Sequence, residues 1–473
     1  MTGQRLEPEL LKSRVDGSAV DGVGPEFTHL SPLDAARGVY TFHEFSREQI
    51  DEAVQRAAVS QRSWIRSSDL SQRVQAVRDF LGKVAAQEES LVSLISRETG
   101  KPHDEASAEF ASSIKEAYNF SEVFGDLGSQ PEGESGIEYM PLGAVALITP
   151  WNFPLSVLMR KLTPALLMGN SVLIKPSELA SATAIEVADL ATGTLPRGLV
   201  NCLVGTGVTG SHLVEHPLVS AVSFTGSTST GRVIAEVCAR RHAKCQLEMG
   251  GSNPVVVAPD ADLSLALSDV VTAAFTCAGQ WCVATRRLVI HESLLDEALE
   301  RLTNRVASYR VGPDGDMGPL IRPEAADRVK SVLEEYREIG CRIIEGSVQP
   351  DALSGSFAAP AVIVAPPVSS VIREEEVFGP VLAVIPYAQT SEAIAIANET
   401  KYALSASIYT RNPATAKAFL AEVEAGVVHV NLPTNHRSFG MPFSGWKSSG
   451  YGAPECGVEG LRFFSRLRTR YAA

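Results

Sequence analysis

The sequence lacks an excess of basic residues. Its 42 Lys and Arg are outnumbered by 55 Asp and Glu, which gives a formal net charge of −13 at pH 7. Proteins that bind nucleic acids or anionic membrane surfaces usually present a basic face, because they must neutralise phosphates. The charge balance therefore argues against both kinds of partner.

Long apolar runs are also missing. No stretch approaches the ~20 apolar residues of a membrane-spanning helix, and the longest runs, such as residues 143–148, have the length of buried strands. Residues 1–7 are polar and lack the apolar core of a signal peptide. We therefore expect a soluble protein without a targeting segment.

Cysteine is scarce and irregularly spaced. An odd number of cysteines without regular spacing forms no disulfide framework and fits a reducing, cytoplasmic compartment. Cys277 and Cys282 stand five positions apart, which is not a zinc-ligand spacing, and no Cys/His cluster accompanies them. We therefore expect no metal site. The seven cysteines are Cys202, Cys238, Cys245, Cys277, Cys282, Cys341 and Cys456.

The composition has no extreme feature. With 45% hydrophobic residues, 21% charged residues, 37 Gly and 27 Pro, the chain is neither collagen-like nor disordered. A chain of 473 residues is longer than a single hydrophobic core usually accommodates, so two or three domains are expected.

Apolar spacing predicts three helices in the first hundred residues. The first begins at Ser46, where Ser46 and Gln49 form a capping-box pattern. The second covers about residues 74–84, and the third covers about residues 91–98 and stops before Gly100, a natural helix-ending residue.

From residue 139 onward, short apolar runs alternate with helical stretches. This rhythm predicts a largely parallel sheet with helices on both faces, and a second α/β stretch starts near Asn253, so that the boundary falls near Gly250-Gly251. The last twelve residues indicate a strand, used either at a subunit contact or as an ordinary edge. The strands are expected at 143–148, 171–174, 200–204, 220–224, 255–257, 288–291, 361–364 and 381–387, and the helices at 155–167, 181–193 and 229–240.

Two glycine-rich stretches are candidates for a phosphate site. Residues 205–210 fit G-x-G-x-x-G after a strand, but the acidic residue expected about 20 positions further on is missing, so the signal is weak. Residues 224–231 leave a strand and enter a helix. Their free N–H groups and hydroxyls either seat a phosphate or simply cap that helix.

Two residues are candidates for chemistry, each with an ordinary alternative. Cys282 follows a glycine-containing turn and is either a buried small hydrophobe or a reactive thiol. Glu248 stands beside two glycines and is either a solvated strand end or a general base at a cleft. Composition does not decide between these alternatives.

Seven short blocks then occur together: TPWNFP at 149–154, KPSE at 175–178, FTGS at 224–227, LEMGG at 247–251, GQWC at 279–282, EEVFGP at 375–380 and PFSG at 442–445. In order and spacing they resemble the NAD(P)-dependent aldehyde dehydrogenase superfamily, over about residues 30–465. The resemblance implies an α/β, aldehyde dehydrogenase-like fold with two Rossmann-like domains plus a small oligomerisation hairpin. The implied domains are an NAD(P)-binding domain over 1–124 and 141–249, a catalytic domain over 250–445, and an oligomerisation element over 125–140 and 446–473.

The resemblance also implies catalytic roles. Cys282 corresponds to the nucleophile, whose thiolate adds to the aldehyde and forms a thiohemiacetal. Asn152 corresponds to the amide of the oxyanion hole. Transfer of a hydride to the nicotinamide then leaves a thioester. Glu248 corresponds to the base that activates the water molecule for hydrolysis of this thioester. A homodimer or homotetramer is expected, with a small-molecule aldehyde as the substrate.

The cofactor residues follow from the same blocks. Lys175 and Glu178 resemble the pair that holds the adenosine ribose, and Ser227 resembles the pyrophosphate ligand. Because Glu178 puts a carboxylate where a 2′-phosphate would sit, we expect NAD, with NADP as the alternative. The other implied cofactor contacts are Thr149, Pro150, Trp151, Ser177, Gly207, Phe224, Thr225, Gly226, Met249, Gly250, Glu376 and Phe378.

The aldehyde itself is indicated by fewer residues. Arg160 occupies the place where succinate-semialdehyde dehydrogenases carry a carboxylate-binding arginine, although Thr276 replaces their second arginine. Residues 250–254 and 430–434 resemble α-ketoglutarate-semialdehyde dehydrogenases, and Arg437 lies in the loop that follows. We expect a carboxylate-bearing semialdehyde with Arg160 or Arg437 as its counter-ion.

Other functions stay open at this point. Trp281 is bulkier than the small residues common at this place in the family, so we expect it to narrow the substrate tunnel. An aromatic aldehyde stacked by Trp281, Phe153 and Phe443 is the first alternative. A CoA-acylating dehydrogenase is disfavoured because such enzymes generally lack the base that Glu248 supplies. A non-catalytic protein on the same fold would need neither Glu248 nor Cys282.

Overall fold

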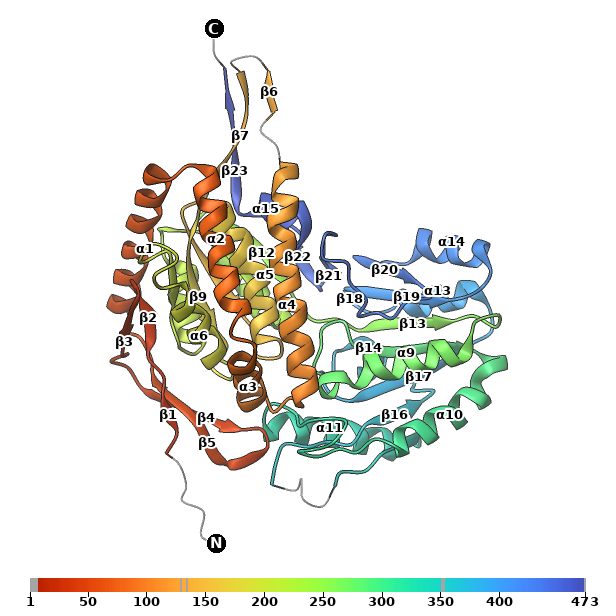
Figure 1. The fold of residues 1–473 in the computed structure, drawn as a ribbon. Coiled ribbons are helices and arrows are strands. Elements are labelled where there is room, and N and C mark those ends of the chain that lie inside the picture. Colours follow the sequence, from red (N-terminus) through yellow and green to blue (C-terminus); the bar gives the residue numbers. More distant parts are fainter. Residues whose placement is uncertain (1–6, 128–129, 133–134, 350–353, 472–473) are drawn as a thin grey trace.

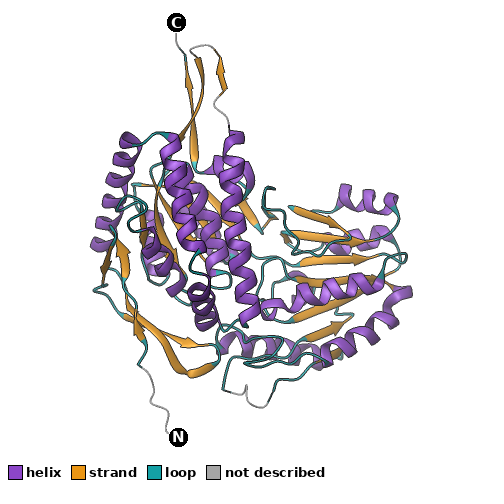
Figure 2. Cartoon of the chain, viewed as in Figure 1, coloured by secondary structure: helices purple, strands orange, loops and turns teal. Residues whose placement is uncertain are grey.

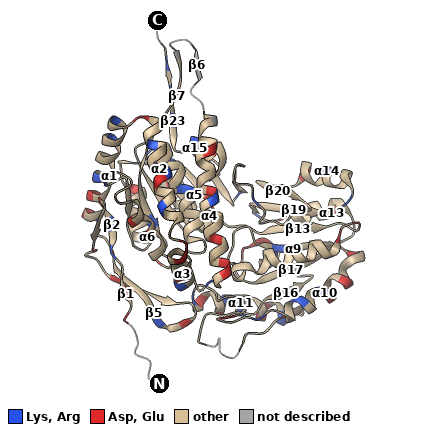
Figure 3. Ribbon diagram, in the orientation of Figure 1, with Lys and Arg blue, Asp and Glu red and all other residues tan. Residues whose placement is uncertain are grey.

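The computed structural model describes residues 7–127, 130–132, 135–349 and 354–471. Two large sheets, each covered by helices on both faces, make up most of the molecule (Figures 1 and 2). The expected α/β architecture is therefore confirmed. None of the helices in the described residues combines the length and apolarity needed to cross a membrane. Basic and acidic positions are interspersed along the helices in Figure 3.

The first sheet is built around five parallel strands. An antiparallel strand is added at each end, and a further antiparallel strand extends one of them. In spatial order the strands are β22 (Gly450–Gly452), β12 (Lys244–Glu248), β11 (Val219–Thr225), β8 (Ala144–Thr149), β9 (Ser171–Pro176), β10 (Val200–Cys202), β2 (Ser13–Val15) and β3 (Ser18–Val20).

Strand β8 illustrates why both faces of this sheet are covered. Ala144, Ala146 and Ile148 pack into one hydrophobic cluster, whereas Val145 and Leu147 pack into the other. A strand buried on both faces has a continuous apolar run instead of an alternating one. One cluster includes α1 (Arg47–Ser67), α7 (Gly207–Glu215) and α8 (Thr228–Arg240); the other includes α2 (Leu70–Ala85), α3 (Glu88–Thr99), α4 (His103–Val123), α5 (Pro154–Leu167) and α6 (Ala182–Ala191).

The second sheet follows the same plan. Six of its seven strands are parallel, and β15 at one edge is antiparallel. In spatial order the strands are β15 (Arg342–Glu345), β16 (Ala361–Val364), β17 (Val381–Tyr387), β14 (Thr285–His291), β13 (Asn253–Val257), β19 (Ser405–Tyr409) and β20 (Val427–Val430). One face packs against α9 (Leu263–Phe275), α10 (Leu295–Ala307) and α11 (Pro323–Glu338), and the other against α13 (Thr390–Asn398) and α14 (Pro413–Glu422).

Several local predictions are confirmed. Ser46 caps α1, since its hydroxyl accepts from Gln49 N at 3.3 Å while the Gln49 side chain accepts from Ser46 N at 3.1 Å. Helix α3 ends at Gly100, whose left-handed φ of 76° favours glycine. The chain leaves the first sheet at the end of β12 and enters the second at Asn253, and Gly250-Gly251 lie between these two strands.

A three-stranded sheet projects from the body beside the C-terminus (Figure 1). It pairs β23 (Ser465–Arg470) with β7 (Ser135–Pro141), and β7 with β6 (Gln130–Glu132). The hairpin strands and the C-terminal strand therefore belong to one sheet, and residues 128–129, 133–134 and 472–473 lie outside the described residues. Residues 446–464 differ from the prediction: β22 extends the first sheet, and α15 (Gly457–Phe463) packs against α4 and α5.

Helix α4 was not predicted from the sequence. Its buried face includes Glu109, Ser113, Glu116 and Ser121 among apolar residues, so the apolar periodicity that marks a helix is interrupted. The remaining elements are β1 (Glu9–Leu10), β4 (Glu26–Ser31) and β5 (Asp34–His43), which form a separate sheet, together with the short elements η1 (Phe124–Leu127), η2 (Thr276–Gly279), η3 (Glu292–Leu294), α12 (Val371–Glu374), β18 (Tyr402–Ala403) and β21 (Trp446–Lys447).

Candidate active site

A large cavity lies where the two α/β units meet. Its volume is about 1020 Å³, and both units contribute to its lining. The structure brings together here all eight residues expected to take part in catalysis or contact substrate, and nine of the expected cofactor contacts. The expected residues that line it are Pro150, Trp151, Asn152, Phe153, Arg160, Thr225, Gly226, Ser227, Glu248, Met249, Gly250, Trp281, Cys282, Glu376, Phe378, Arg437 and Phe443.

The thiol of Cys282 follows an unusual backbone turn. Cys277, Ala278 and Gly279 all have left-handed φ values, of 55°, 53° and 69°. A side chain at Gly279 would put its Cβ 2.3 Å from the carbonyl oxygen of Gly379, so only glycine fits there. Asn253 Nδ2 then donates to Cys282 O at 2.8 Å and fixes the chain at the thiol.

The environment of Cys282 keeps its thiol protonated at rest. The side chain is half-buried, and burial, with the carboxylates of Glu376 and Glu248 acting in the same direction, raises the pKa of Cys282 to about 12. Because the thiolate is the nucleophile, deprotonation at neutral pH requires a base or a nearby positive charge.

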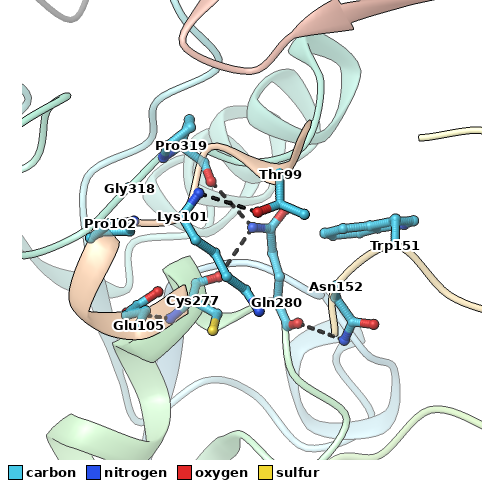
Figure 4. A pocket seen from close by; sticks show the side chains of 10 residues that line it. All are labelled: Thr99, Lys101, Pro102, Glu105, Trp151, Asn152, Cys277, Gln280, Gly318 and Pro319. Atoms are coloured by element: carbon cyan, nitrogen blue, oxygen red, sulfur yellow. Dashed lines mark hydrogen bonds between the residues drawn. The ribbon is translucent and has the colours of Figure 1, made fainter. Parts of the chain in front are cut away.

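The amide of Asn152 points at the segment that carries this thiol. Asn152 lies in the loop between β8 and α5, and its Nδ2 donates to Gln280 O at 2.9 Å (Figure 4). An amide nitrogen carries two hydrogens. The second hydrogen has no partner among the described residues, which leaves it available for a substrate oxygen.

Glu248 ends β12 and is 3% exposed. Neither oxygen of its carboxylate has a hydrogen-bond partner among the described residues. Burial, followed by the negative charge of Glu455, raises the pKa of Glu248 well above its usual value, although Lys161 and Arg160 oppose this shift. Such a buried carboxylate without partners is typical of a general base at a functional site.

Five linked charged side chains reach Glu248 through Glu455, Lys161 and Arg160. We call them the charge cluster: Glu116, Arg160, Lys161, Arg437 and Glu455. Arg160 binds Glu116 through Nε–Oε1 at 3.0 Å and Nη2–Oε2 at 3.4 Å, and its Nη1 lies 3.5 Å from Glu455 Oε2. Lys161 pairs with Glu455, and Arg437 Nη2 lies 2.5 Å from Glu116 Oε1. Three cations and two carboxylates leave one net positive charge.

Glu116 stays ionised at the centre of this cluster. Burial alone would raise its pKa, but the attraction of Arg160 and Arg437 outweighs burial and lowers the pKa. Helix α5 is buried along its whole length, and the Lys161 side chain is fully buried while Arg160 reaches only the cavity, so both cations need carboxylate partners within the protein.

The two arginines expected to meet a substrate carboxylate therefore differ. All three nitrogens of the Arg160 guanidinium lie near carboxylates of this chain, which weighs against Arg160 as a free counter-ion. Arg437 is 18% exposed. Only its Nη2 is engaged, by Glu116 and by Cys456 Sγ at 3.3 Å, while Nε and Nη1 have no partner among the described residues.

Aromatic rings line the same part of the cavity. The rings of Phe153 and Trp281 lie 5.0 Å apart, centroid to centroid. The guanidinium carbons of Arg160 and Arg437 lie 5.6 and 5.1 Å from the ring centroid of Phe443. Trp151 meets Phe378 edge-on at 5.7 Å.

The start of α8 opens into the cavity. Ser227 is its N-cap and accepts from Thr230 N at 3.2 Å. Thr225 Oγ1, also in the lining, is buried without a partner among the described residues. A Cβ on Gly226 would lie 2.5 Å from the Phe224 ring. Helix N-termini with free N–H groups seat phosphates, so the residues fit a dinucleotide pyrophosphate.

Six expected cofactor residues do not line this cavity: Thr149, Lys175, Ser177, Glu178, Gly207 and Phe224. Lys175 is near the carboxyl end of β9, on the sheet edge where doubly wound folds bind dinucleotides. Its Nζ lies 3.4 Å from Glu178 Oε2, and burial lowers the pKa of Lys175 although Glu178 opposes this.

Gly207 is in a different situation. It begins α7, whose N-terminus is already occupied by the carboxylate of Glu44, which accepts from Thr206 N at 3.0 Å and Thr209 N at 3.1 Å. An internal anion fills the place that a phosphate would take. The geometry therefore gives no support to Gly207 as a phosphate contact, and the weak glycine pattern has a structural explanation.

Four residues of the site were not predicted from the sequence: Glu116, Lys161, Gln280 and Glu455. One signal was available for Lys161, because two adjacent basic residues inside the apolar segment of α5 require buried partners. Glu116 lies on a helix that was itself not predicted. Within the described residues, no group of three or more His, Cys, Asp or Glu side chains could hold a metal ion.

The chain is similar in sequence to known proteins over nearly its whole length. A family model described as "Aldehyde dehydrogenase family" matches residues 20–470. The chain is 33% identical to an alpha-ketoglutarate semialdehyde dehydrogenase of Haloferax volcanii, over 97% of this chain and 98% of that protein. It is 35% identical to a 3,6-anhydro-alpha-L-galactose dehydrogenase of Streptomyces coelicolor, over 90% and 89%.

Solved structures agree with these relatives. A betaine aldehyde dehydrogenase from Staphylococcus aureus, in complex with NAD+, superimposes with a TM-score of 0.91 at 29% identity, covering 97% of this chain and 94% of that one. The similarity therefore extends over nearly the whole chain and includes a protein that binds a nicotinamide cofactor.

Proposed function

The chain belongs to the aldehyde dehydrogenase family and is an NAD(P)-dependent aldehyde dehydrogenase, and we propose that its substrate carries a carboxylate in addition to the aldehyde. The observation that carries this proposal is the guanidinium of Arg437. It lines the cavity with two nitrogens unengaged among the described residues, beside a cluster with one net positive charge.

The catalytic steps are proposed from the residues around the thiol. Cys282 Sγ adds to the aldehyde carbon, and the second hydrogen of Asn152 Nδ2 donates to the alkoxide that develops. One such donor typically contributes ~3 kcal/mol. NAD(P)+, when bound, supplies the hydride acceptor that turns the thiohemiacetal of Cys282 into a thioester.

Glu248 is proposed as the base for hydrolysis. Its carboxylate lines the cavity and has no hydrogen-bond partner among the described residues, so it is available for a water molecule. A CoA-acylating reaction needs no such base, which favours hydrolysis to the free acid.

For the cofactor we propose a preference for NAD over NADP. Glu178 Oε2 lies 3.4 Å from Lys175 Nζ and partly neutralises the cation that would otherwise attract a 2′-phosphate. Removing this carboxylate should therefore improve the use of NADP.

An aromatic aldehyde is the second candidate. The paired rings of Phe153 and Trp281, 5.0 Å apart, offer a stacking surface in the same cavity. Two relatives at 33% identity are named as semialdehyde dehydrogenases of α-ketoglutarate, which favours the carboxylate-bearing substrate.

We also propose that the chain forms a homodimer or homotetramer through the projecting sheet. Strand β23 is at the edge of the described sheet, and Leu467 on it is 63% exposed. An edge strand with an exposed apolar side chain suits pairing with a second copy. Sedimentation analysis of the purified protein would show a monomer if this is wrong.

A substrate panel tests the function. Succinate semialdehyde, α-ketoglutarate semialdehyde, butanal and benzaldehyde are each incubated with NAD or NADP, with and without CoA, and the absorbance of the reduced cofactor is followed. The two semialdehydes should give the highest kcat/KM without a need for CoA, and Cys282→Ala should be inactive with all four. Higher kcat/KM for benzaldehyde than for both semialdehydes would replace the carboxylate with the aromatic candidate.

A further inference from the structure

Helix α5, which begins two residues after Asn152, has no side-chain cap of its own. Its N-cap residue is Phe153, whose side chain cannot accept a hydrogen bond. The N–H groups of Leu155 and Ser156 in the first turn would lack an acceptor, and both donate to Oε1 of Glu109, at 3.0 and 3.2 Å. Glu109, on α4, therefore replaces the Ser, Thr or Asp that usually caps a helix locally.

The other oxygen of Glu109 is held by Lys101. Lys101 Nζ lies 2.5 Å from Glu109 Oε2, and the two side chains are 6% and 0% exposed. The same ammonium lies 3.8 Å from the ring centroid of Phe153, which in turn packs on Trp281, the residue before the thiol. The ion pair therefore contacts both the start of α5 and the aromatic wall beside the nucleophile.

The first turn of α4 also reaches the segment that leads to the thiol. Glu105 Oε1 accepts from Cys277 N at 2.9 Å, where the left-handed turn begins. Gln280 Nε2 donates to Cys277 O at 3.1 Å and to Pro319 O at 3.2 Å (Figure 4). A strained turn persists only where its surroundings hold it. The nucleophile side of the site is thus held independently of Glu109.

We infer that Glu109, supported by Lys101, is a positioning residue for aldehyde addition, because it holds the Asn152 amide at the place where the alkoxide forms. Asn152 immediately precedes the N-cap residue, so a frayed first turn of α5 would move its amide away from Gln280 O and from the substrate. The inference rests on the proposed function, which assigns the alkoxide to Asn152.

The expected effect is on aldehyde addition, and it is read from the rate of the first turnover. Loss of one oxyanion donor lowers kcat by about 10²–10³-fold. A donor that is displaced but still present lowers kcat by a smaller factor. Glu109→Ala should therefore slow the first turnover by about 100-fold. Glu109→Gln keeps an acceptor oxygen for Leu155 and Ser156 but loses the charge that holds Lys101, so a loss of about tenfold is expected.

The test uses rapid-mixing measurement of the first turnover in the full-length enzyme, with NAD and the best aldehyde of the panel. Glu122→Gln is the matched control, because Glu122 is an exposed glutamate near the other end of the same helix. Binding of NAD and the thermal midpoint are measured for every variant. Lys101→Met provides a second route to the same effect if Glu109→Ala does not fold.

A double-mutant comparison separates positioning from general damage. If Glu109 acts through Asn152, then Glu109→Gln should slow the first turnover of the unmutated enzyme but change the residual rate of Asn152→Ala by less than about twofold. An equal loss in both backgrounds, or no loss in either, overturns the inference. If Asn152→Ala itself leaves the first turnover unchanged, the proposed function fails instead.

Discussion

Replacement of Arg437 by methionine is expected to change which aldehydes the enzyme prefers. Methionine keeps an unbranched stem beside the Phe443 ring, whose centroid lies 5.1 Å from the guanidinium carbon, while removing the charge. Glu116 would retain its two contacts to Arg160, at 3.0 and 3.4 Å, so no buried carboxylate loses its last cation. The substitution therefore removes a substrate contact without unbalancing the charge cluster.

The magnitude follows from the environment of Arg437. Removing one partner of a buried charge pair costs ~2–5 kcal/mol, and a hydrogen bond to a charged group contributes ~1.5–3 kcal/mol. Arg437 is 18% exposed and already shares its charge with Glu116 at 2.5 Å, so the lower end of both ranges applies. A loss of ~2 kcal/mol corresponds to a fall of roughly 30-fold in kcat/KM for the carboxylate-bearing aldehyde.

The assay compares succinate semialdehyde with butanal, a neutral aldehyde of the same chain length. Arg437→Met should lower kcat/KM for the semialdehyde by roughly 30-fold. It should leave kcat/KM for butanal within about threefold of the value for the unmutated enzyme. Arg160→Met is the matched control. This substitution removes the bidentate partner of Glu116, so it should lower kcat/KM for both aldehydes by the same factor and lower the thermal midpoint of the protein. Equal losses with Arg437→Met, or a selective loss with Arg160→Met, would refute the reasoning.

Three further outcomes are expected. Glu248→Gln should preserve a rapid burst of reduced cofactor followed by slow turnover, whereas loss of the burst would assign Glu248 to thiol activation. Because the charge of Glu455 raises the pKa of Glu248, Glu455→Gln should move the rise of turnover with pH to lower pH, and an unchanged or upward-shifted profile contradicts this. Gly250→Ala would bring a Cβ within 2.1 Å of Glu376 Oε2, so we expect the Kd for NAD, measured by calorimetry, to rise about tenfold; an unchanged Kd would show that Glu376 does not contact the cofactor.

Features that depend on neighbours along the chain could be predicted from the sequence. The cap at Ser46 and the end of α3 at Gly100 follow from local spacing, because a few adjacent residues decide each of them. The parallel pairing of the first sheet follows from the alternation of short apolar runs with helical stretches. The seven blocks likewise identified the expected nucleophile, base and amide, and the structure brings Cys282, Glu248 and Asn152 to one cavity.

The tertiary structure decided which charges are available. Arg160 and Arg437 are equivalent candidates in the sequence, but Glu116 and Glu455, which engage Arg160, are 44 and 295 residues away from it along the chain. The same applies to Glu109, which caps a helix 46 residues further on. Local patterns do not encode such partners, since a buried charge is compensated by whichever opposite charge the fold brings near. That compensation, and not the residue type, determines whether an arginine binds a substrate or holds the protein together.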